Sequence, residues 1–243
     1  MSDLSIAERE PQHPTSGDFL RDIVFGANDG VVTAIGFLVG IVGTVSDQSV
    51  VVVAGSLTII AGAASMALGN YLGVKSQREH YEAMEAVENW EIDHKPEIER
   101  EEIREIYTNM GFDKEAVEIL TKKVTSDRKL WLKVMMRDEL GFSEKENNNP
   151  VIAGAVMGFT YLLGGLPPLL PFIFFKPLSR ALILSVIASV VVMAFIGVFR
   201  WWLNKGGLSK KIVETIVIGL LAAGIGFLAG EILRYVGITE IAL

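Results

Sequence analysis

Residues 21–30 read Arg-Asp-Ile-Val-Phe-Gly-Ala-Asn-Asp-Gly and open an apolar segment that ends near Val45. This stretch places Asp22 and Asp29 seven residues apart, which is about two helical turns or roughly 10 Å along the axis. Both carboxylates therefore face the same way at the head of a segment that is otherwise apolar enough to span a membrane. An ionisable side chain inside a spanning helix is costly, so a functional role is the first hypothesis for both acids. For Asp22, which stands beside Arg21 near the start of the span, the alternative is an ordinary acid at a helix start.

The composition is that of a multi-pass membrane protein. The chain has 243 residues, 50% of them hydrophobic, with 24 glycines and no cysteine. The absence of cysteine excludes disulfides, zinc–thiolate sites and thiol catalysis. Because a spanning helix takes about 20 apolar residues, the hydropathy pattern predicts five spans. They cover approximately residues 22–45, 50–74, 151–175, 181–199 and 212–235.

The predicted fold is all-α, a five-span transmembrane bundle with a helical domain inserted between spans two and three. Residues 1–17 are expected to form a disordered tail, 18–78 spans one and two, 79–149 the insert, and 150–243 spans three to five. The insert carries 19 acidic and 11 basic residues, and the net charge of the chain is −7. This acidity argues against nucleic acid as a partner and favours cations.

Lysine and arginine mark one side of the predicted bundle. They follow span two and flank the loop between spans four and five, at Lys75, Arg78, Arg200, Lys205, Lys210 and Lys211. The positive-inside rule therefore predicts that the N-terminus and the insert are cytosolic. An integral protein of a vacuolar-type membrane and one of a prokaryotic plasma membrane both fit this pattern.

Proline and glycine predict where the helices end. Nothing between Val74 and Trp90 breaks a helix, so span two is expected to continue straight into the insert. Pro96 and Gly111 bracket the next helix, and two more are predicted at about residues 113–124 and 126–140, the last of them ended by Gly141. In span three, prolines 167, 168 and 171 are expected to end or kink the helix near its far end.

Small residues recur at four-residue spacing along the predicted spans. Such spacing lets helix backbones approach closely, within a subunit or across a dimer. The pairs are Gly26 and Gly30, Gly36 and Gly40, Gly69 and Gly73, Gly154 and Gly158, and Gly226 and Gly230.

The insert contains a glutamate ladder in which acids repeat at helical spacing. Its members are Glu79, Glu82, Glu85, Glu88, Glu91, Glu99, Glu102 and Glu105. Residues three apart share a helix face, so Glu88 with Glu91, and Glu99 with Glu102, are each predicted to form a two-carboxylate clamp for a divalent cation. The alternative is a solvated acidic face, since lysine and arginine stand close by in the sequence.

Methionines add a softer set of candidate ligands. Met135 and Met136 precede Glu139 by three or four residues, a mixture of sulfur and oxygen that suits Fe(II) better than Mg(II) or Ca(II). Met66, deep in span two, is predicted to face Asp29 across a small-residue interface. The alternative for each methionine is the packing of a core.

At this point the chain resembles the vacuolar iron transporter family of plants and yeast. The resemblance rests on residues 21–30, on residues 62–72 around Ser65-Met66, on residues 131–141 from Trp131 to Gly141, and on the later Pro150 and Gly164-Gly-Leu-Pro167. The family resemblance implies a five-span homodimer with an ion path at the subunit interface and a cytosolic metal-binding domain. It also implies proton-coupled export of ferrous iron and manganese.

The resemblance implies roles for particular residues. Those of the transport path are Asp22, Asp29 and Met66, and the metal ligands of the insert are Glu88, Glu91, Glu99, Glu102, Met135, Met136 and Glu139. Two positions depart from the family, because Thr58 and Asn70 stand where many members carry an acid. The loss of acids near the path puts the proton stoichiometry and the rank order of metals in question.

The predicted function is membrane transport and not enzymatic catalysis. Fe(II) is the expected cargo, with Mn(II), Co(II) and Zn(II) as further candidates, and no resident cofactor is expected. Proton exchange fits because metal and proton compete for the same carboxylates. Two alternatives stay open: a membrane-anchored ferroxidase, suggested by the Glu91-Ile-Asp-His94 pattern, and an iron-binding protein without transport.

Overall fold

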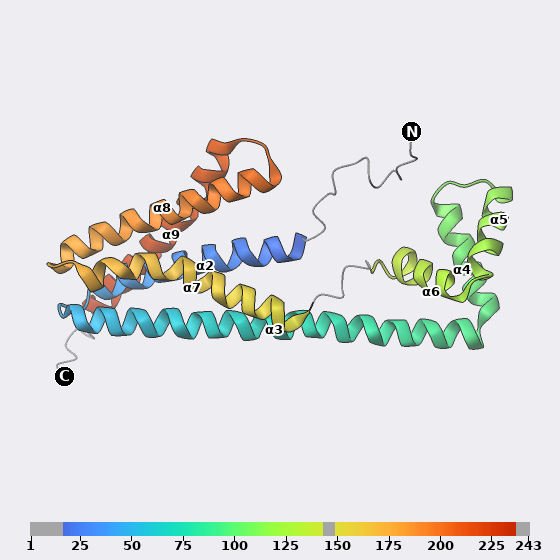
Figure 1. The fold of residues 1–243 in the computed structure, drawn as a ribbon, viewed down its shortest axis with the longest axis horizontal. Coiled ribbons are helices and arrows are strands. Elements are labelled where there is room, and N and C mark those ends of the chain that lie inside the picture. The colour runs from blue at the N-terminus through green and yellow to red at the C-terminus, as the bar shows by residue number, and fades with distance from the viewer. Residues whose placement is uncertain (1–16, 143–148, 237–243) are drawn as a thin grey trace, which may run out of the picture. The chain divides into compact units, whose positions relative to one another are not determined.

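The computed structural model describes residues 17–142 and 149–236, and every regular element within these ranges is helical (Figure 1). The tail predicted for residues 1–17 lies outside the described residues, apart from Gly17, which begins the first helix. The chain forms two compact units. The membrane unit combines the chain up to Asn70 with the chain from Val151 onward, and the inserted unit runs from Tyr71 to Pro150.

Within the described residues, five helices are long and apolar enough to cross a membrane, as predicted. Four of them, with their full bounds, are α2 (Gly17–Val42), α7 (Pro150–Phe174), α8 (Leu178–Asn204) and α9 (Leu208–Tyr235). The fifth is α3 (Gln48–His94), which contributes residues to both units.

Helix α3 continues from the second predicted span into the insert without a break, which confirms that expectation. It has 47 residues and is therefore about 70 Å long, more than twice the roughly 30 Å of a bilayer's apolar core. Its uncharged part ends at Val74, and Lys75 begins the charged part. Only the first part of α3 is therefore suited to hydrocarbon.

The prolines of span three lie within its helix and do not end it where they stand, while the kink that was predicted as the alternative stays a prediction. Helix α7 contains Pro167, Pro168 and Pro171 and still runs on to Phe174. Proline is tolerated inside membrane helices because neighbouring groups satisfy the backbone around it. Here the hydroxyl of Ser185 in α8 donates to the carbonyl of Pro168 at 2.6 Å, and this residue of α8 is fully buried.

Glycines bring α2 into backbone contact with its neighbours. Gly30 lies against the carbonyl of Tyr161 and Gly164 lies against the carbonyl of Ala27, so α2 and α7 touch with no side chain between them. On another part of α2, Gly36 and Gly40 meet the Gly226 region of α9 in the same way. Helix α2 also contacts α8, so it is the helix around which the membrane unit is packed.

The predicted small-residue pairs are therefore used unequally. Gly26, Gly30, Gly36 and Gly40 all lie at tight contacts, whereas a methyl group added at Gly69 or Gly73 would meet no atom of the described residues within 4 Å. A large apolar cluster completes the packing between α2, α3 and α7, with Leu38, Ile59 and Tyr161 among its buried members.

The inserted unit has its own apolar core. Four short elements follow α3 in it: α4 (Pro96–Asn109), α5 (Lys114–Thr125), α6 (Arg128–Val134) and a turn of π-helix, η1 (Met135–Glu139). They gather beside the C-terminal part of α3 (Figure 1). Ile92, Ile103, Val117, Trp131 and Met135 are buried against one another in this core.

The local ends of these helices follow the sequence signals. Asp113 accepts a hydrogen bond from the backbone of Ala116 at 2.8 Å and so caps α5. The helix predicted for residues 126–140 is corrected in one respect, since it is α-helical only to Val134 and then widens into η1. Gly141, at a φ of 75°, ends this segment as predicted.

The backbone contact between α2 and α7 predicts an asymmetric effect of adding one methyl group. Gly164→Ala should destabilise the protein by about 1–3 kcal/mol, because its Cβ would collide with the carbonyl oxygen of Ala27. Gly69→Ala is the matched control and should stabilise α3 by about 0.5–1 kcal/mol, since its Cβ meets nothing. Thermal unfolding in detergent measures both variants, and equal melting temperatures would contradict the contact.

Candidate metal centre

Three carboxylates from three separate helical elements meet inside the inserted unit. Glu88 of α3, Glu99 of α4 and Glu139 of η1 each offer an oxygen, and these three oxygens all lie within 4.8 Å of one another. Glu88 and Glu99 are buried, with 4% and 2% exposure, whereas Glu139 borders solvent. We refer to these three residues as the carboxylate group.

Two oxygens of the carboxylate group are buried without a hydrogen-bond partner in the part of the chain that the structure describes. One belongs to Glu88 and the other to Glu99. An unpaired buried carboxylate oxygen is costly, and the cost falls when the oxygen binds a cation. Hard or borderline divalent ions prefer clustered carboxylate oxygens. The arrangement can therefore hold a divalent metal ion.

Protons compete for the same oxygens. Burial raises the pKa of Glu99 to about 8, and the charges of Glu102, Glu88 and Glu91, with a hydrogen bond to Glu102, add to the effect. Desolvation, followed by the charges of nearby glutamates, raises the pKa of Glu139 to about 7. Near neutral pH the empty group therefore retains protons that a metal ion would displace.

Some residues of the glutamate ladder lie near the carboxylate group, and others do not. Glu102 lies beside the carboxylate group, where its charge acts on both Glu99 and Glu139. Glu91 also acts on the group but is held by Lys95, whose Nζ is 2.9 Å from its Oε1. Glu82 pairs instead with Arg78 at 2.8 Å on the surface of α3. Within one helix, Glu99 is hydrogen-bonded to Glu102 and Glu88 feels the charge of Glu91, so the spacing-based pairs stay close together, and the contact between helices adds Glu139 to them.

The two predicted methionine ligands, Met135 and Met136, are buried in the inserted unit. Met135 is fully buried in the apolar core, and Met136 is 4% exposed. Met136 also lines a cavity of about 260 Å³ with Tyr81, Leu132 and Phe142. Both residues belong to η1, and turns of π-helix occur often at functional sites. Nothing in the sequence pattern signals η1, because its residues fit an ordinary α-helix.

The two residues of the Glu91–His94 pattern, Glu91 and His94, each contact other side chains of the inserted unit. The ring of His94 stacks on Trp90 with centroids 4.6 Å apart, and its Nδ1 lies 2.8 Å from the carbonyl of Trp90. Glu91 is the residue held by Lys95. This geometry gives the ferroxidase alternative no support.

In the membrane unit, Asp22 is buried with 2% exposure, and both of its carboxylate oxygens accept hydrogen bonds. Asn70 of α3 donates to its Oδ2 at 2.9 Å, and Arg21 donates to its Oδ1 at 3.2 Å. The same amide of Asn70 donates to the carbonyl of Ala153 in α7 at 2.9 Å. Asp22 and Asn70 therefore tie α2, α3 and α7 together.

Asp29, two turns deeper on α2, has a different setting. It is half-buried, and it lies close enough to Tyr161 of α7 for an electrostatic interaction. The Tyr161 hydroxyl is hydrogen-bonded to Thr33 and lies directly against Gly62 of α3, where a methyl group would not fit. Met66, one turn further along α3, packs against the cluster that contains Tyr161.

Tyr161 is the residue of this region that the sequence prediction missed. It is 2% exposed and brings a phenol hydroxyl into an otherwise apolar helix interface. The available signal was a tyrosine in the middle of an apolar span, opposite glycines that leave room for it. At the departing position Thr58, the hydroxyl simply donates to the carbonyl of Ala54 in its own helix at 2.9 Å.

Comparison with known proteins gives one family and several curated relatives. The sequence model of the VIT family matches residues 20–231. The chain is 32% identical over 224 residues to "Vacuolar iron transporter 2" of Oryza sativa subsp. japonica, covering 92% of this chain and 91% of the relative. It is 29% identical to "Vacuolar iron transporter 1" of Arabidopsis thaliana, with 92% and 90% coverage.

A yeast relative extends the comparison. The chain is 31% identical over 213 residues to "Protein CCC1" of Saccharomyces cerevisiae. The matched region covers 84% of this chain and 66% of that protein. The plant relatives are named as transporters and not as enzymes.

The carboxylate group predicts an unusual dependence of stability on pH. The folded-state pKa of Glu99 is about 8, above the ordinary 4.5, so the folded protein binds more protons than the unfolded chain between these values. The contribution of Glu99 to the stability of the metal-free protein should therefore be greatest below about pH 4.5. It should be lost as the pH rises from there through about 8. Melting temperatures in chelator at pH 5.5, 7 and 8.5 measure it, and a rise across this range in wild type relative to Glu99→Gln would contradict it.

Metal should reverse that trend. Mn(II) at pH 8 should raise the melting temperature of the wild-type protein by several degrees, because it binds the folded protein and neutralises the negative charges of the carboxylate group. Glu99→Gln should melt higher than wild type without metal at pH 8 and gain little from Mn(II). Glu105→Gln, on the exposed face of α4, is the control and should behave as wild type. An equal Mn(II) response in all three proteins would remove Glu99 from the site.

Proposed function

The chain belongs to the VIT family, and from this membership we propose that it is a multi-pass membrane transporter that exports Fe(II) from the cytosol. Mn(II) is proposed as a second cargo, and proton antiport as the source of energy. Five helices able to cross a membrane and relatives named as vacuolar iron transporters support transport rather than catalysis.

The observation that carries the proposal is the carboxylate group. Glu88, Glu99 and Glu139 gather acidic oxygens in the inserted unit, outside the apolar part of α3. We propose that this group captures the metal in the cytosol, with Glu91, Glu102, Met135 and Met136 able to join it as it fills. For Glu91 this requires release from Lys95, an exposed ion pair worth little in water.

Within the membrane unit, we propose Asp29 and Met66 as the ion-binding pair. A carboxylate inside a spanning helix is retained at a cost, which supports a functional role for Asp29. The thioether adds the softer ligand that favours Fe(II) over Mg(II). Because Asp29 is half-buried in a single chain, a second copy in a homodimer would complete the enclosure of the path.

The role proposed for Asp22 is altered by its surroundings. Its carboxylate accepts hydrogen bonds from Asn70 and Arg21, and the bond from Asn70 links α2 to α3. We propose that Asp22 holds the helices in place at the cytosolic end of α2. Proton coupling then depends on Asp29 and on the carboxylate group.

Replacement of the path carboxylate tests transport directly. Asp29→Asn in proteoliposomes should reduce the uptake of Fe(II) and Mn(II) to the level of empty vesicles, because an amide cannot offer an anionic ligand. Asp47→Asn, in the exposed turn before α3, should transport as wild type. A metal-sensitive dye inside the vesicles gives the rate, and unimpaired flux in Asp29→Asn would exclude Asp29 from the path.

A second variant tests how Asp29 is positioned. Tyr161→Phe keeps the ring in its buried site and removes only the hydroxyl beside Thr33, Gly62 and Asp29. We expect roughly tenfold slower metal flux, as for other residues that orient a ligand from behind. Its melting temperature should stay within a few degrees of wild type, and Tyr235→Phe, at an exposed position, is the control. Wild-type rates would show that the hydroxyl serves packing alone.

A further inference from the structure

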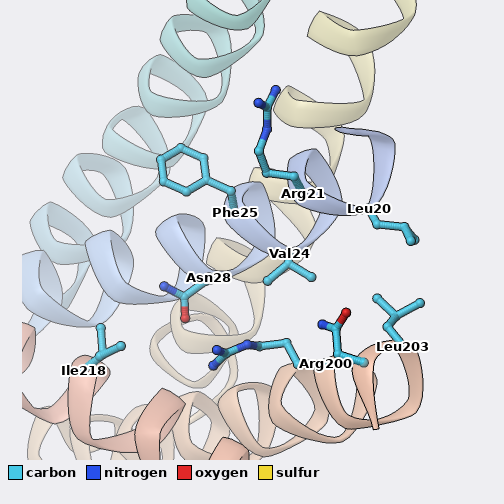
Figure 2. Close-up of a pocket in the computed structure, with 9 residues that line it drawn as sticks. Leu20, Arg21, Val24, Phe25, Asn28, Arg200, Leu203 and Ile218 are labelled. Carbon is cyan, nitrogen blue, oxygen red and sulfur yellow. The ribbon is translucent and has the colours of Figure 1, made fainter. Parts of the chain in front are cut away.

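A pocket in the membrane unit is lined by none of the residues proposed as metal ligands. It has a volume of about 490 Å³ and is formed by α2, α8 and α9 (Figure 2). Leu20 and Val24 of α2, Leu203 of α8 and Ile218 of α9 give it apolar walls. Its volume is in the range of roughly 300–1,000 Å³ that is usual for sites of small organic ligands.

The pocket also contains an arginine from the last turns of α8. Arg200 is only 28% exposed, and its guanidinium donates to the buried hydroxyl of Thr215 at 3.0 Å and to Glu214 at 3.3 Å. A guanidinium has five donors, so these bonds leave others available. Figure 2 shows the Arg200 guanidinium and the Asn28 side chain directed toward one another in the pocket. Both side chains can donate hydrogen bonds to an anion.

The surroundings of the pocket favour a negative ligand. The two segments that form it, residues 17–28 and 200–218, carry five basic and three acidic residues. The basic residues are Arg21, Arg200, Lys205, Lys210 and Lys211. One acid, Asp22, is already buried and hydrogen-bonded to Asn70. Arg200 also stands one turn before the end of α8, after the apolar run of this helix.

We propose that this pocket binds one anionic phospholipid. Its phosphate accepts hydrogen bonds from Arg200 and Asn28, and an acyl chain lies along Leu20, Val24 and Ile218. Basic pockets between spanning helices are suited to anionic headgroups. A lipid fits better than a free anion, because apolar side chains form most of the wall and a free anion would leave them uncovered. The proposal does not depend on the transport of metal.

Lipid titration of the purified full-length protein tests the site. After delipidation in detergent, phosphatidylglycerol should bind in native mass spectrometry and raise the melting temperature, whereas phosphatidylcholine and inorganic phosphate should do neither. Arg200→Gln should weaken phosphatidylglycerol binding by roughly fivefold or more. Arg180→Gln, near the other end of the same helix and stacked on Phe175, is the matched control and should bind as wild type.

Three results of the lipid titration would overturn the proposal. They are equal binding of both lipids, stabilisation by inorganic phosphate alone, and unchanged binding in Arg200→Gln. Should Arg200→Gln fail to fold, Val24→Trp fills the pocket from α2 without removing a charge and should also abolish binding. The chain has no cysteine, so Leu203→Cys provides a single thiol. Its efficient cross-linking to a second copy in a bilayer would place a subunit there instead of a lipid.

Discussion

The direct backbone contact between α2 and α7 is the constraint on which the membrane unit depends. Gly30 and Gly164 let the two helices meet with no side chain between them, and Gly36 and Gly40 do the same for α2 and α9. In hydrocarbon no hydrophobic force drives helices together, so close van der Waals packing has to supply the attraction. This packing sets the depth and direction of Asp29, because Asp29 is next to Gly30. The proposed path thus depends on glycines that bear no chemistry themselves.

Polar groups fasten the same helices at a few points. Asn70 bridges Asp22 and the carbonyl of Ala153, and Ser185 donates to the carbonyl of Pro168. Each bond satisfies a group that would otherwise be buried in an apolar medium. Asn70 is notable because many family members are expected to carry an acid there. An amide beside Asp22 forms a permanent donor to the carboxylate, whereas an acid would need a proton to do so.

The inserted unit follows the opposite principle. Its core is conventional, with Ile103, Trp131 and Met135 fully packed, but Glu88 and Glu99 are buried at its edge. Like charges brought together in this way destabilise the empty unit and raise the affinity for any ion that neutralises them. A capture site that gives up its metal to a transport path benefits from this balance, since protons can take the place of the ion.

The sequence by itself determined the elements of this protein. Apolar length predicted five spans, the lack of a breaker after Val74 predicted the continuous α3, and Asp113 and Gly141 marked helix ends that are present in the structure. It also singled out Asp29 and the glutamates, because a charge in an apolar span and acids at helical spacing can be recognised in the amino-acid sequence.

Tertiary structure alone decided which acids meet. Glu88 joins Glu99 and Glu139 from three elements, a contact that spacing along one helix could not show. The hydroxyl of Tyr161, the turn of π-helix at Met135–Glu139 and the engagement of Asp22 by Asn70 were likewise set by packing between distant segments. Periodicity fixes the face of a helix that a side chain shares, and only the neighbouring helices fix what that face contacts.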